Sequence, residues 1–305
     1  MTYVIHILPL KIKEHNVKQS ILFKTLLYLV FLSLAQASMA MSQVPPLDDR
    51  EILAHRGASG MYPQSTWLAF QKALDQGADV LEMDVHLSKD NVVIVNHDAD
   101  FSKTTGSDEK VEDLTLNQIK QMDAGYAFTK DNGQTFPFRG MGLEVLTLRE
   151  VMEFFPSVPL NIEMKANKEA LAEKVWDLIQ EFNTEEQSAV ASQHTKAMNH
   201  FRDVSQGQVK TSATIAELTA ASVAWSTGFG WAYSPKFELA QIPYAIITKP
   251  YLDWFRDKGV RTHVWTVNDA DDVKRAFDLG ADGVIGDYPD RIYQDLVNRG
   301  ERPEL

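Results

Sequence analysis

The octapeptide ALDQGADV at residues 73–80 recurs in closely similar form as AFDLGADG at residues 276–283. In both copies a helical pattern runs up to a glycine suited to the C′ position of a helix, and the following turn leads into a strand-like segment. Apolar residues at helical spacing accompany each copy: Trp67, Phe70 and Leu74 in the first, and Val273, Ala276 and Phe277 in the second. The chain therefore uses the same helix-to-strand connection twice.

Short β-rich runs alternate with helical patterns from residue 51 onward. The candidate strands are residues 52–54, 80–86, 92–96, 160–164, 189–192, 209–212, 245–248, 262–267 and 283–285. A third amphipathic stripe consists of Leu171, Val175, Leu178, Ile179 and Phe182. Repeated strand–helix units predict an α/β fold with a parallel sheet, and about eight of them predict a closed (β/α)8 (TIM) barrel.

Residues 99–150 interrupt this alternation. They are polar, contain glycines and hold one helical candidate near residues 115–122. We therefore expect a small insertion after the third strand, and an insertion of this length on a barrel usually has a functional role, such as covering the site.

The first 40 residues resemble a targeting segment. Four lysines precede an uncharged apolar run at residues 26–35, and the small-residue sequences AQA and SMA follow at 35–37 and 38–40. This order predicts a secretory signal peptide (residues 1–40) cleaved after Ala37 or Ala40, with a retained anchor as the alternative. The apolar run is shorter than the roughly 20 residues of a membrane span, so we expect none after signal removal. The expected barrel domain is then residues 41–305, in a periplasmic or secreted protein.

The charge of the chain restricts its partners. Four lysines and one glutamate give residues 1–40 a net charge of +3. Since the whole chain has a net charge of −12, residues 41–305 have a net charge of −15. An acidic surface argues against binding to nucleic acid or to anionic membranes. The chain has no cysteine, which excludes disulfides and thiolate zinc sites. The sequence gives no indication of the oligomeric state.

Charged residues gather unusually on the apolar strand candidates between residues 51 and 98. Glu82 and Asp84 are two apart on one candidate strand, so their side chains share a face. Oxygen ligands at this spacing favour Ca²⁺ or Mg²⁺, although a solvated carboxylate pair at a strand end is the simpler alternative. The turn-like segment at residues 89–91 predicts a hairpin that brings His97 opposite this pair. The alternative is that the two strands run parallel and are joined by a short crossover.

Three further residues extend the cluster. Glu163 follows another apolar run before a helix and supplies a third carboxylate, which favours a metal site. Lys165 lies on the same face and would suit a phosphate oxygen, and Arg56 can grip a phosphate through its planar guanidinium. Together with His55 and His97, which titrate near neutral pH, these groups predict acid–base hydrolysis.

The other histidines have weaker claims. His86 and His194 are secondary candidates, His200 and His263 are expected to be structural, and His6 and His15 fall in the leader.

This arrangement resembles the glycerophosphodiester phosphodiesterases, whose signature is His-Arg-Gly, then Glu-x-Asp, then His-Asp. Here the signature is HRG at residues 55–57, EMD at 82–84 and HD at 97–98. The likeness continues through NIEMK at 161–165, WTVN at 265–268 and GADGVIGDYPD at 280–290, and so spans about residues 51–293.

The resemblance implies a role for each matching position. His55 and His97 would be the general acid and base, and Glu82, Asp84 and Glu163 would bind a divalent metal ion, Ca²⁺ or Mg²⁺. Arg56 and Lys165 would hold the phosphodiester, and Trp265 would form a wall of the site. The implied reaction is the metal-dependent hydrolysis of a small glycerophosphodiester to glycerol 3-phosphate and an alcohol.

One segment departs from the family pattern. The family usually has Pro-Glu-Asn-Thr after the first loop, whereas this chain has PQST at residues 63–66. Gln64 removes one carboxylate near the site and puts the metal affinity in question. We expect the loop to survive, because Pro63 and the helix-start chemistry of Ser65 and Thr66 remain.

Two classes of alternative stay open. An aromatic cluster suggests a lysophospholipase D acting on lipids that keep one acyl chain, although core packing of the same residues is the simpler explanation. The cluster comprises Trp225, Phe229, Trp231, Tyr233 and Phe237. A catalytically silent phosphoester-binding module would be expected to lack a histidine or a metal ligand. A cyclase-type phospholipase C on a related barrel fits a three-carboxylate site less well.

Overall fold

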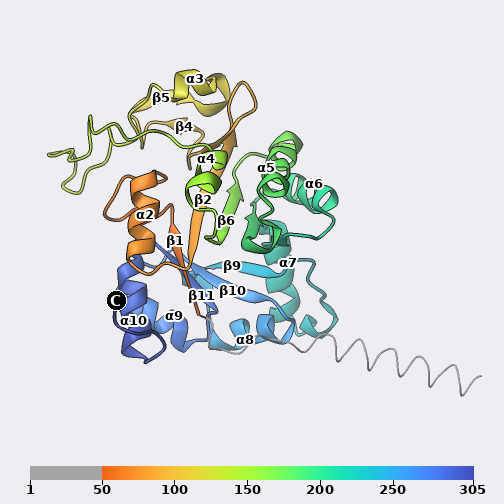
Figure 1. The fold of residues 1–305 in the computed structure, drawn as a ribbon. Helices are drawn as coiled ribbons and strands as arrows, with labels where there is room; N and C mark the ends of the chain where they lie inside the picture. Colours follow the sequence, from red (N-terminus) through yellow and green to blue (C-terminus); the bar gives the residue numbers. More distant parts are fainter. Residues whose placement is uncertain (1–49) are drawn as a thin grey trace, which may run out of the picture. The chain divides into compact units, whose positions relative to one another are not determined.

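The computed structural model describes residues 50–305, which form a barrel of parallel strands surrounded by helices (Figure 1). The signal-peptide prediction falls outside the described residues. In the described part of the chain, no helix is both long enough and apolar enough to cross a bilayer.

The barrel strands are hydrogen-bonded in the order β8-β7-β6-β2-β1-β11-β10-β9, and a parallel bridge between Ser212 and Leu239 joins the two ends of this sheet. In chain order they are β1 (Glu51–His55), β2 (Val80–Leu87), β6 (Leu160–Met164), β7 (Ser188–Ala191), β8 (Lys210–Thr211), β9 (Leu239–Pro243), β10 (Arg261–Trp265) and β11 (Gly283–Gly286). The (β/α)8 barrel expected from the alternating pattern is thus confirmed.

A helix follows each barrel strand. These helices are α2 (Trp67–Asp75), α4 (Leu148–Phe154), α5 (Glu169–Phe182), α6 (Thr195–Ser205), α7 (Ile215–Ser226), α8 (Lys249–Asp257), α9 (Ala270–Asp278) and α10 (Pro289–Asn298). Most of them bury an apolar stripe against the sheet, as expected for amphipathic helices around a barrel. Helix α5, for example, buries Leu171, Val175 and Ile179 of the predicted stripe.

One predicted strand is wrong. Residues 245–248 are not a strand, because Tyr244–Ile246 form a short 3-10 helix (η4). The strand at this place in the barrel is β9, whose sequence LAQIP contains a glutamine and a proline. Proline cannot donate to a sheet, and here it ends the strand, so the more apolar AIIT segment after it is the stronger strand signal in the sequence.

Residues 88–147 leave the barrel between β2 and α4. Strand β3 (Val93–Val95) folds back antiparallel on β2, which confirms the hairpin alternative. After it come β4 (Asp100–Phe101), β5 (Ser107–Lys110), η1 (Val111–Asp113) and α3 (Leu116–Ile119). These elements pack around their own apolar cluster, which includes Phe101, Val111 and Ile119.

Candidate active site

The charged residues that interrupt the apolar strands meet at the carboxyl ends of β1, β2 and β6. In the register of the sheet, His55 lies beside Glu82, and Asp84 lies beside Glu163. Successive side chains of a strand point alternately into and out of a barrel. These side chains therefore meet inside the barrel, at the end where the strands finish. Active sites of this fold are built at that end.

The three carboxylates predicted as metal ligands converge. Glu82, Asp84 and Glu163 each offer an oxygen atom, and these atoms all lie within 4.8 Å of one another. Glu82 is only 4% exposed and Asp84 only 1%. Burial, with the neighbouring charge of Asp84, raises the pKa of Glu82 to about 7. Burial also raises the pKa of Glu163.

This crowding fits a divalent cation. Three acidic groups at such short range repel one another, and the Oε1 atom of Glu163 is buried without a hydrogen-bond partner. An all-oxygen donor set is the chemistry that Ca²⁺ and Mg²⁺ prefer. The residues present therefore match the ligand set implied by the sequence.

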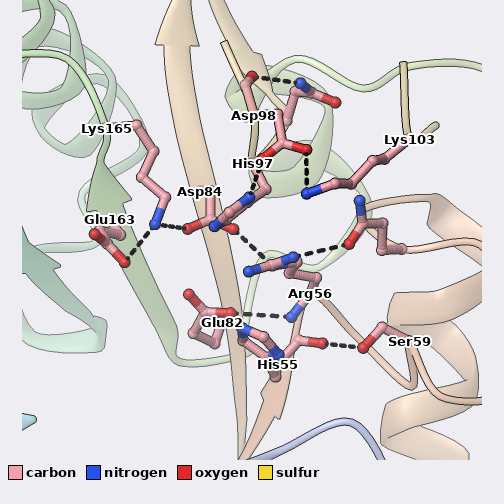
Figure 2. A network of polar contacts seen from close by, with 12 residues as sticks. His55, Arg56, Ser59, Glu82, Asp84, His97, Asp98, Lys103, Glu163 and Lys165 are labelled. Carbon is pink, nitrogen blue, oxygen red and sulfur yellow. Dashed lines mark hydrogen bonds and ion pairs between the residues drawn. The ribbon is translucent and has the colours of Figure 1, made fainter. Parts of the chain in front are cut away.

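Two cations neutralise part of this charge, as Figure 2 shows. Arg56 Nε lies 2.9 Å from Asp84 Oδ2, and its backbone N–H donates to Glu82 Oε2 at 3.0 Å. Lys165 Nζ lies 3.0 Å from both Asp84 Oδ1 and Glu163 Oε2. Burial alone would lower the pKa of Lys165, but the charges of Asp84 and Glu163 outweigh it and raise the pKa. Lys165 therefore stays a cation beside the cluster.

Each predicted catalytic histidine has a carboxylate partner. His55 Nδ1 lies 2.6 Å from Asp287 Oδ1, and His97 Nδ1 lies 2.7 Å from Asp98 Oδ1. A carboxylate on Nδ1 fixes the tautomer and leaves Nε2 to exchange protons. For His55, burial opposes the charged form, but the hydrogen bond to Asp287 outweighs it and raises the pKa. For His97, burial prevails and lowers the pKa.

Asp287 is itself held in place. Asn268 Nδ2 donates to its Oδ2 atom at 2.6 Å, and Ser59 Oγ donates to its Oδ1 atom at 3.0 Å. The sequence contains Asp98 directly after His97, so that pairing could have been suspected. The Asp287–His55 pairing joins residues 232 positions apart, and only the closing of the barrel between β1 and β11 brings them together.

The departure at Gln64 has a defined location. Its Oε1 atom accepts a hydrogen bond from Arg56 Nη1 at 3.0 Å. Gln64 therefore acts on Arg56, the cation that pairs with Asp84. The expectation that the loop survives is confirmed, since Thr66 caps α2 by accepting from the backbone N–H of Ala69 at 3.2 Å.

One cavity of about 790 Å³ collects the site. Its lining includes His55, Arg56, Glu82, His97, Glu163, Lys165 and Trp265. Asp84 lies below this surface, where it joins the two cations. The structure thus brings together every residue that the sequence singled out for the site. No residue of 99–150 belongs to the lining of this cavity.

The remaining histidines lie outside the lining. His86 Nε2 contacts the carbonyl oxygen of His97 at 3.0 Å, and His194 Nε2 contacts that of Lys165 at 3.1 Å. Both therefore support the backbone behind site residues. His263 lies at the opposite end of the barrel, with Nε2 2.9 Å from Glu51 Oε2, and His200 pairs with Glu173 on the surface.

The aromatic cluster of residues 225–237 divides into two parts. Trp225 packs on Tyr251 with ring centroids 4.9 Å apart, Tyr233 packs on Trp254, and Phe237 is buried. These three follow the core-packing alternative, although Trp225 also reaches the cavity. Phe229 and Trp231 are exposed, Trp231 by 79%.

Known proteins share this sequence and fold. The chain is 31% identical to a glycerophosphodiester phosphodiesterase of Bacillus altitudinis, over 79% of this chain and 96% of the relative. It is 27% identical to a lysophospholipase D of Rattus norvegicus, over 81% of this chain and 86% of the relative. A phosphodiesterase of Oleispira antarctica, solved with the product sn-glycerol-3-phosphate, has a TM-score of 0.68 at 22% identity and covers 81% of this chain and 96% of its own.

Residues 55–291 match the model of the glycerophosphoryl diester phosphodiesterase family. That segment begins at His55 and contains every carboxylate, cation and histidine of the site described above. The chain is a member of the glycerophosphoryl diester phosphodiesterase family.

Proposed function

We propose that this enzyme hydrolyses glycerophosphodiesters to glycerol 3-phosphate and an alcohol, with His55 and His97 as the proton-transferring pair. One observation carries the proposal. Two carboxylate-supported histidines flank a cluster of three carboxylates and two cations, and all of these except the buried Asp84 line a single cavity. Family membership and the phosphodiesterases among the relatives support the same chemistry.

The cations would hold the substrate. A phosphodiester is a monoanion, and Arg56 and Lys165 both line the cavity beside the carboxylates. The guanidinium can bind two phosphoryl oxygens at once, whereas the ammonium acts as a point charge. Both stabilise the negative charge that develops on the phosphoryl oxygens in the transition state.

Glu82, Asp84 and Glu163 would hold a divalent cation, Ca²⁺ or Mg²⁺. When bound there, such an ion supplies Lewis acidity and neutralises charge on the phosphoryl group. The carboxylates also keep Arg56 and Lys165 positioned through the ion pairs with Asp84.

The histidines would divide the two proton transfers. One removes a proton from the nucleophile, which is either water or the glycerol hydroxyl next to the phosphate. The other protonates the oxygen of the leaving alcohol. Asp287 and Asp98 orient the two rings and stabilise the imidazolium that forms on either side.

A second substrate class is favoured by a specific observation. Part of the cavity lining is uncharged and apolar, including Ile215, Leu218 and Ile246, which a polar head group does not need. Relatives named lysophospholipase D support cleavage of the same bond in lipids with one acyl chain. Under this alternative the products are a lysophosphatidic acid and the head-group alcohol.

We also propose that the enzyme acts outside the cytoplasm, because residues 1–40 have the basic, apolar and small-residue order of a signal peptide. Cell fractionation with an antibody against the barrel tests this. Recovery of the processed protein in the periplasm or medium supports export, and recovery of the full-length chain in the cytosol contradicts it.

The central experiment is a phosphodiester panel with coupled detection of glycerol 3-phosphate. Purified enzyme is assayed on glycerophosphocholine, glycerophosphoethanolamine and bis(p-nitrophenyl) phosphate, with EDTA and after adding back Ca²⁺ or Mg²⁺. We expect glycerol 3-phosphate from the first two substrates, loss of activity with EDTA and recovery with one of the ions. Activity that EDTA leaves unchanged would overturn the metal-ligand assignment.

A further inference from the structure

Helix α7 packs differently from the other barrel helices. Among residues 50–305, each of the other seven helices that follow a barrel strand buries at least three residues. Helix α7 has 12 residues and buries only Ala221. A helix of that length normally presents a continuous apolar stripe to the core. Most of the inner side of α7 therefore faces something other than the sheet.

The inner side of α7 faces the catalytic cavity. Seven residues of the helix line that cavity and fall at relative positions 0, 3, 4, 7, 8, 10 and 11, which is one helical face. They are Ile215, Leu218, Thr219, Ser222, Val223, Trp225 and Ser226. At 1.5 Å per residue the helix forms a wall about 18 Å long. The same cavity contains His55 and His97, so the wall is continuous with the reaction centre.

Polar and aromatic contacts fix the helix beside the barrel. Near its start, Arg202 Nη1 donates to Glu217 Oε1 at 2.6 Å. Near its middle, the Ser222 hydroxyl and the Tyr251 hydroxyl of α8 lie 2.6 Å apart. Trp225 packs on the Tyr251 ring. These contacts hold α7 beside the barrel (Figure 1), and the space along its inner face is part of the cavity.

The residues of α7 that line the cavity carry no charge. Residues 218–235 are 18 consecutive uncharged residues in a chain of which 24% is charged. At the mouth of the cavity, Ile215 is 58% exposed and Val223 is 56% exposed. Ile246, which follows β9, also lines the cavity and is half exposed. Apolar side chains gathered at the mouth of a cavity mark a surface that an apolar ligand covers.

We propose that the groove between α7 and the barrel binds the single hydrocarbon chain of a lysoglycerophospholipid whose phosphodiester lies at the histidines. The proposal rests on the proposed function and names its preferred substrate class. The ligand is identified by the fact that the groove and the reaction centre are parts of one cavity. A hydrocarbon chain in this groove begins where the glycerol of a bound phosphodiester ends. A single groove lined by one helical face accommodates one chain, so diacyl lipids are excluded as good substrates.

The test compares two substrates that share the scissile bond and the choline head group. Glycerophosphocholine has no chain, and lysophosphatidylcholine has one, so the ratio of their kcat/KM values measures what the chain contributes. Choline release is followed for both, with lysolipids of six to ten carbons kept below their critical micelle concentrations. We expect kcat/KM to rise with each added pair of methylenes until the groove is filled.

Val223→Asp is the informative variant, and Ala220→Asp is its matched control. Both place a carboxylate at an exposed position of α7, but Val223 lines the cavity and Ala220 does not. Val223→Asp should lower the lysophosphatidylcholine to glycerophosphocholine ratio at least tenfold, mainly through KM. Ala220→Asp should leave the ratio within twofold of the wild type.

The outcomes separate this proposal from the proposed function. If both variants change the ratio equally, or if chain length has no effect, or if diacyl phosphatidylcholine is cleaved as well as the lysolipid, the groove proposal is overturned. If the wild type cleaves neither substrate, the proposed function fails. The groove is then decided by titrating octylphosphocholine, which should bind Val223→Asp at least tenfold more weakly than Ala220→Asp, and equal affinities would overturn it.

Discussion

The two sides of the catalytic cavity differ in charge. The side formed by β1, β2, β6 and β11 carries carboxylates, histidines and cations linked by short contacts. The side formed by α7 carries no charge between residues 218 and 235 and has only one fully buried residue. The first side holds groups that can act on any phosphodiester, whereas the second meets only the part of a substrate that extends away from the phosphate.

Both sides give up stability, though for different reasons. Buried carboxylates repel one another and lose hydration, as the raised pKa of Glu82 shows. Helix α7 gives up the apolar burial that its length could supply, at about 25 cal/mol per Å². Such sacrifices are expected where a protein surface is arranged for a ligand rather than for its own core. The comparison predicts that changes on the charged side affect all substrates, while changes on α7 discriminate among them.

The largest effect is expected from removing a histidine. His97→Ala and His55→Ala should each lower kcat by about 10²–10⁴-fold, because each removes a proposed general acid or base. The loss should be similar for glycerophosphocholine and for lysophosphatidylcholine, and thermal unfolding should stay cooperative. His200→Ala, at a partly exposed position on α6 outside the cavity lining, is the control. A histidine variant that loses activity on one substrate alone would contradict the prediction that the charged side acts on all substrates alike.

A large effect is also expected from a metal ligand. Glu163→Gln removes one of three converging carboxylates, so calorimetric titration should show Ca²⁺ or Mg²⁺ affinity reduced by at least about 10-fold. Activity on both substrates should recover in part at high metal concentration. Glu173→Gln, on the surface of α5, should bind the ion like the wild type. Unchanged metal affinity in Glu163→Gln would remove this residue from the ligand set.

An intermediate effect is expected at the positioning residue Asp287. Asp287→Asn keeps the size of the side chain but removes the anionic partner of His55, so kcat should fall by about 10–100-fold with little change in KM. Asp290→Asn, three residues later and exposed, should change neither constant. A rise in KM with kcat unchanged would instead assign Asp287 to substrate binding.

The smallest effect is expected at the opposite end of β1. Burial opposes ionisation of Glu51, but the interaction with His263, whose Nε2 lies 2.9 Å from Glu51 Oε2, outweighs it and lowers the pKa. Since the folded-state pKa lies below the unfolded value, this pair stabilises the fold above about pH 4.5, and the contribution is lost as the pH falls through the lowered pKa. Glu51→Gln should therefore cost about 1 kcal/mol in urea unfolding at pH 7 and less at pH 3.5.

The kinetic constants of Glu51→Gln should match those of the wild type on both substrates. His263 on β10 and His55 on β1 lie near opposite ends of the barrel and each pairs with a carboxylate, so this variant separates a structural pair from the proposed catalytic one. A loss of turnover in Glu51→Gln would show that the chemistry is not confined to one end of the barrel.

Local sequence patterns accounted for much of the barrel. The stripes around Phe70, Leu171 and Val273 all became amphipathic helices. They succeeded because burial on one face of a helix leaves a direct periodic trace in the sequence. The prediction missed strand β9 because its sequence has a weak apolar pattern. Gln241 lines the cavity and Pro243 ends the strand, so neither position carries the apolar residue typical of a buried strand.

The sequence by itself determined the chemistry-bearing residues, because histidines, carboxylates and cations on apolar strands are costly unless they act together. It also determined the family, through motifs that occur in order along the chain. Only the tertiary structure decided that Asp287 supports His55 and that Gln64 acts on Arg56, since these pairings depend on which loops the barrel brings together. Only the tertiary structure also showed that α7 forms an uncharged wall of the cavity. The composition of α7 is visible in the sequence, but the side that faces the cavity is decided by how the helix packs.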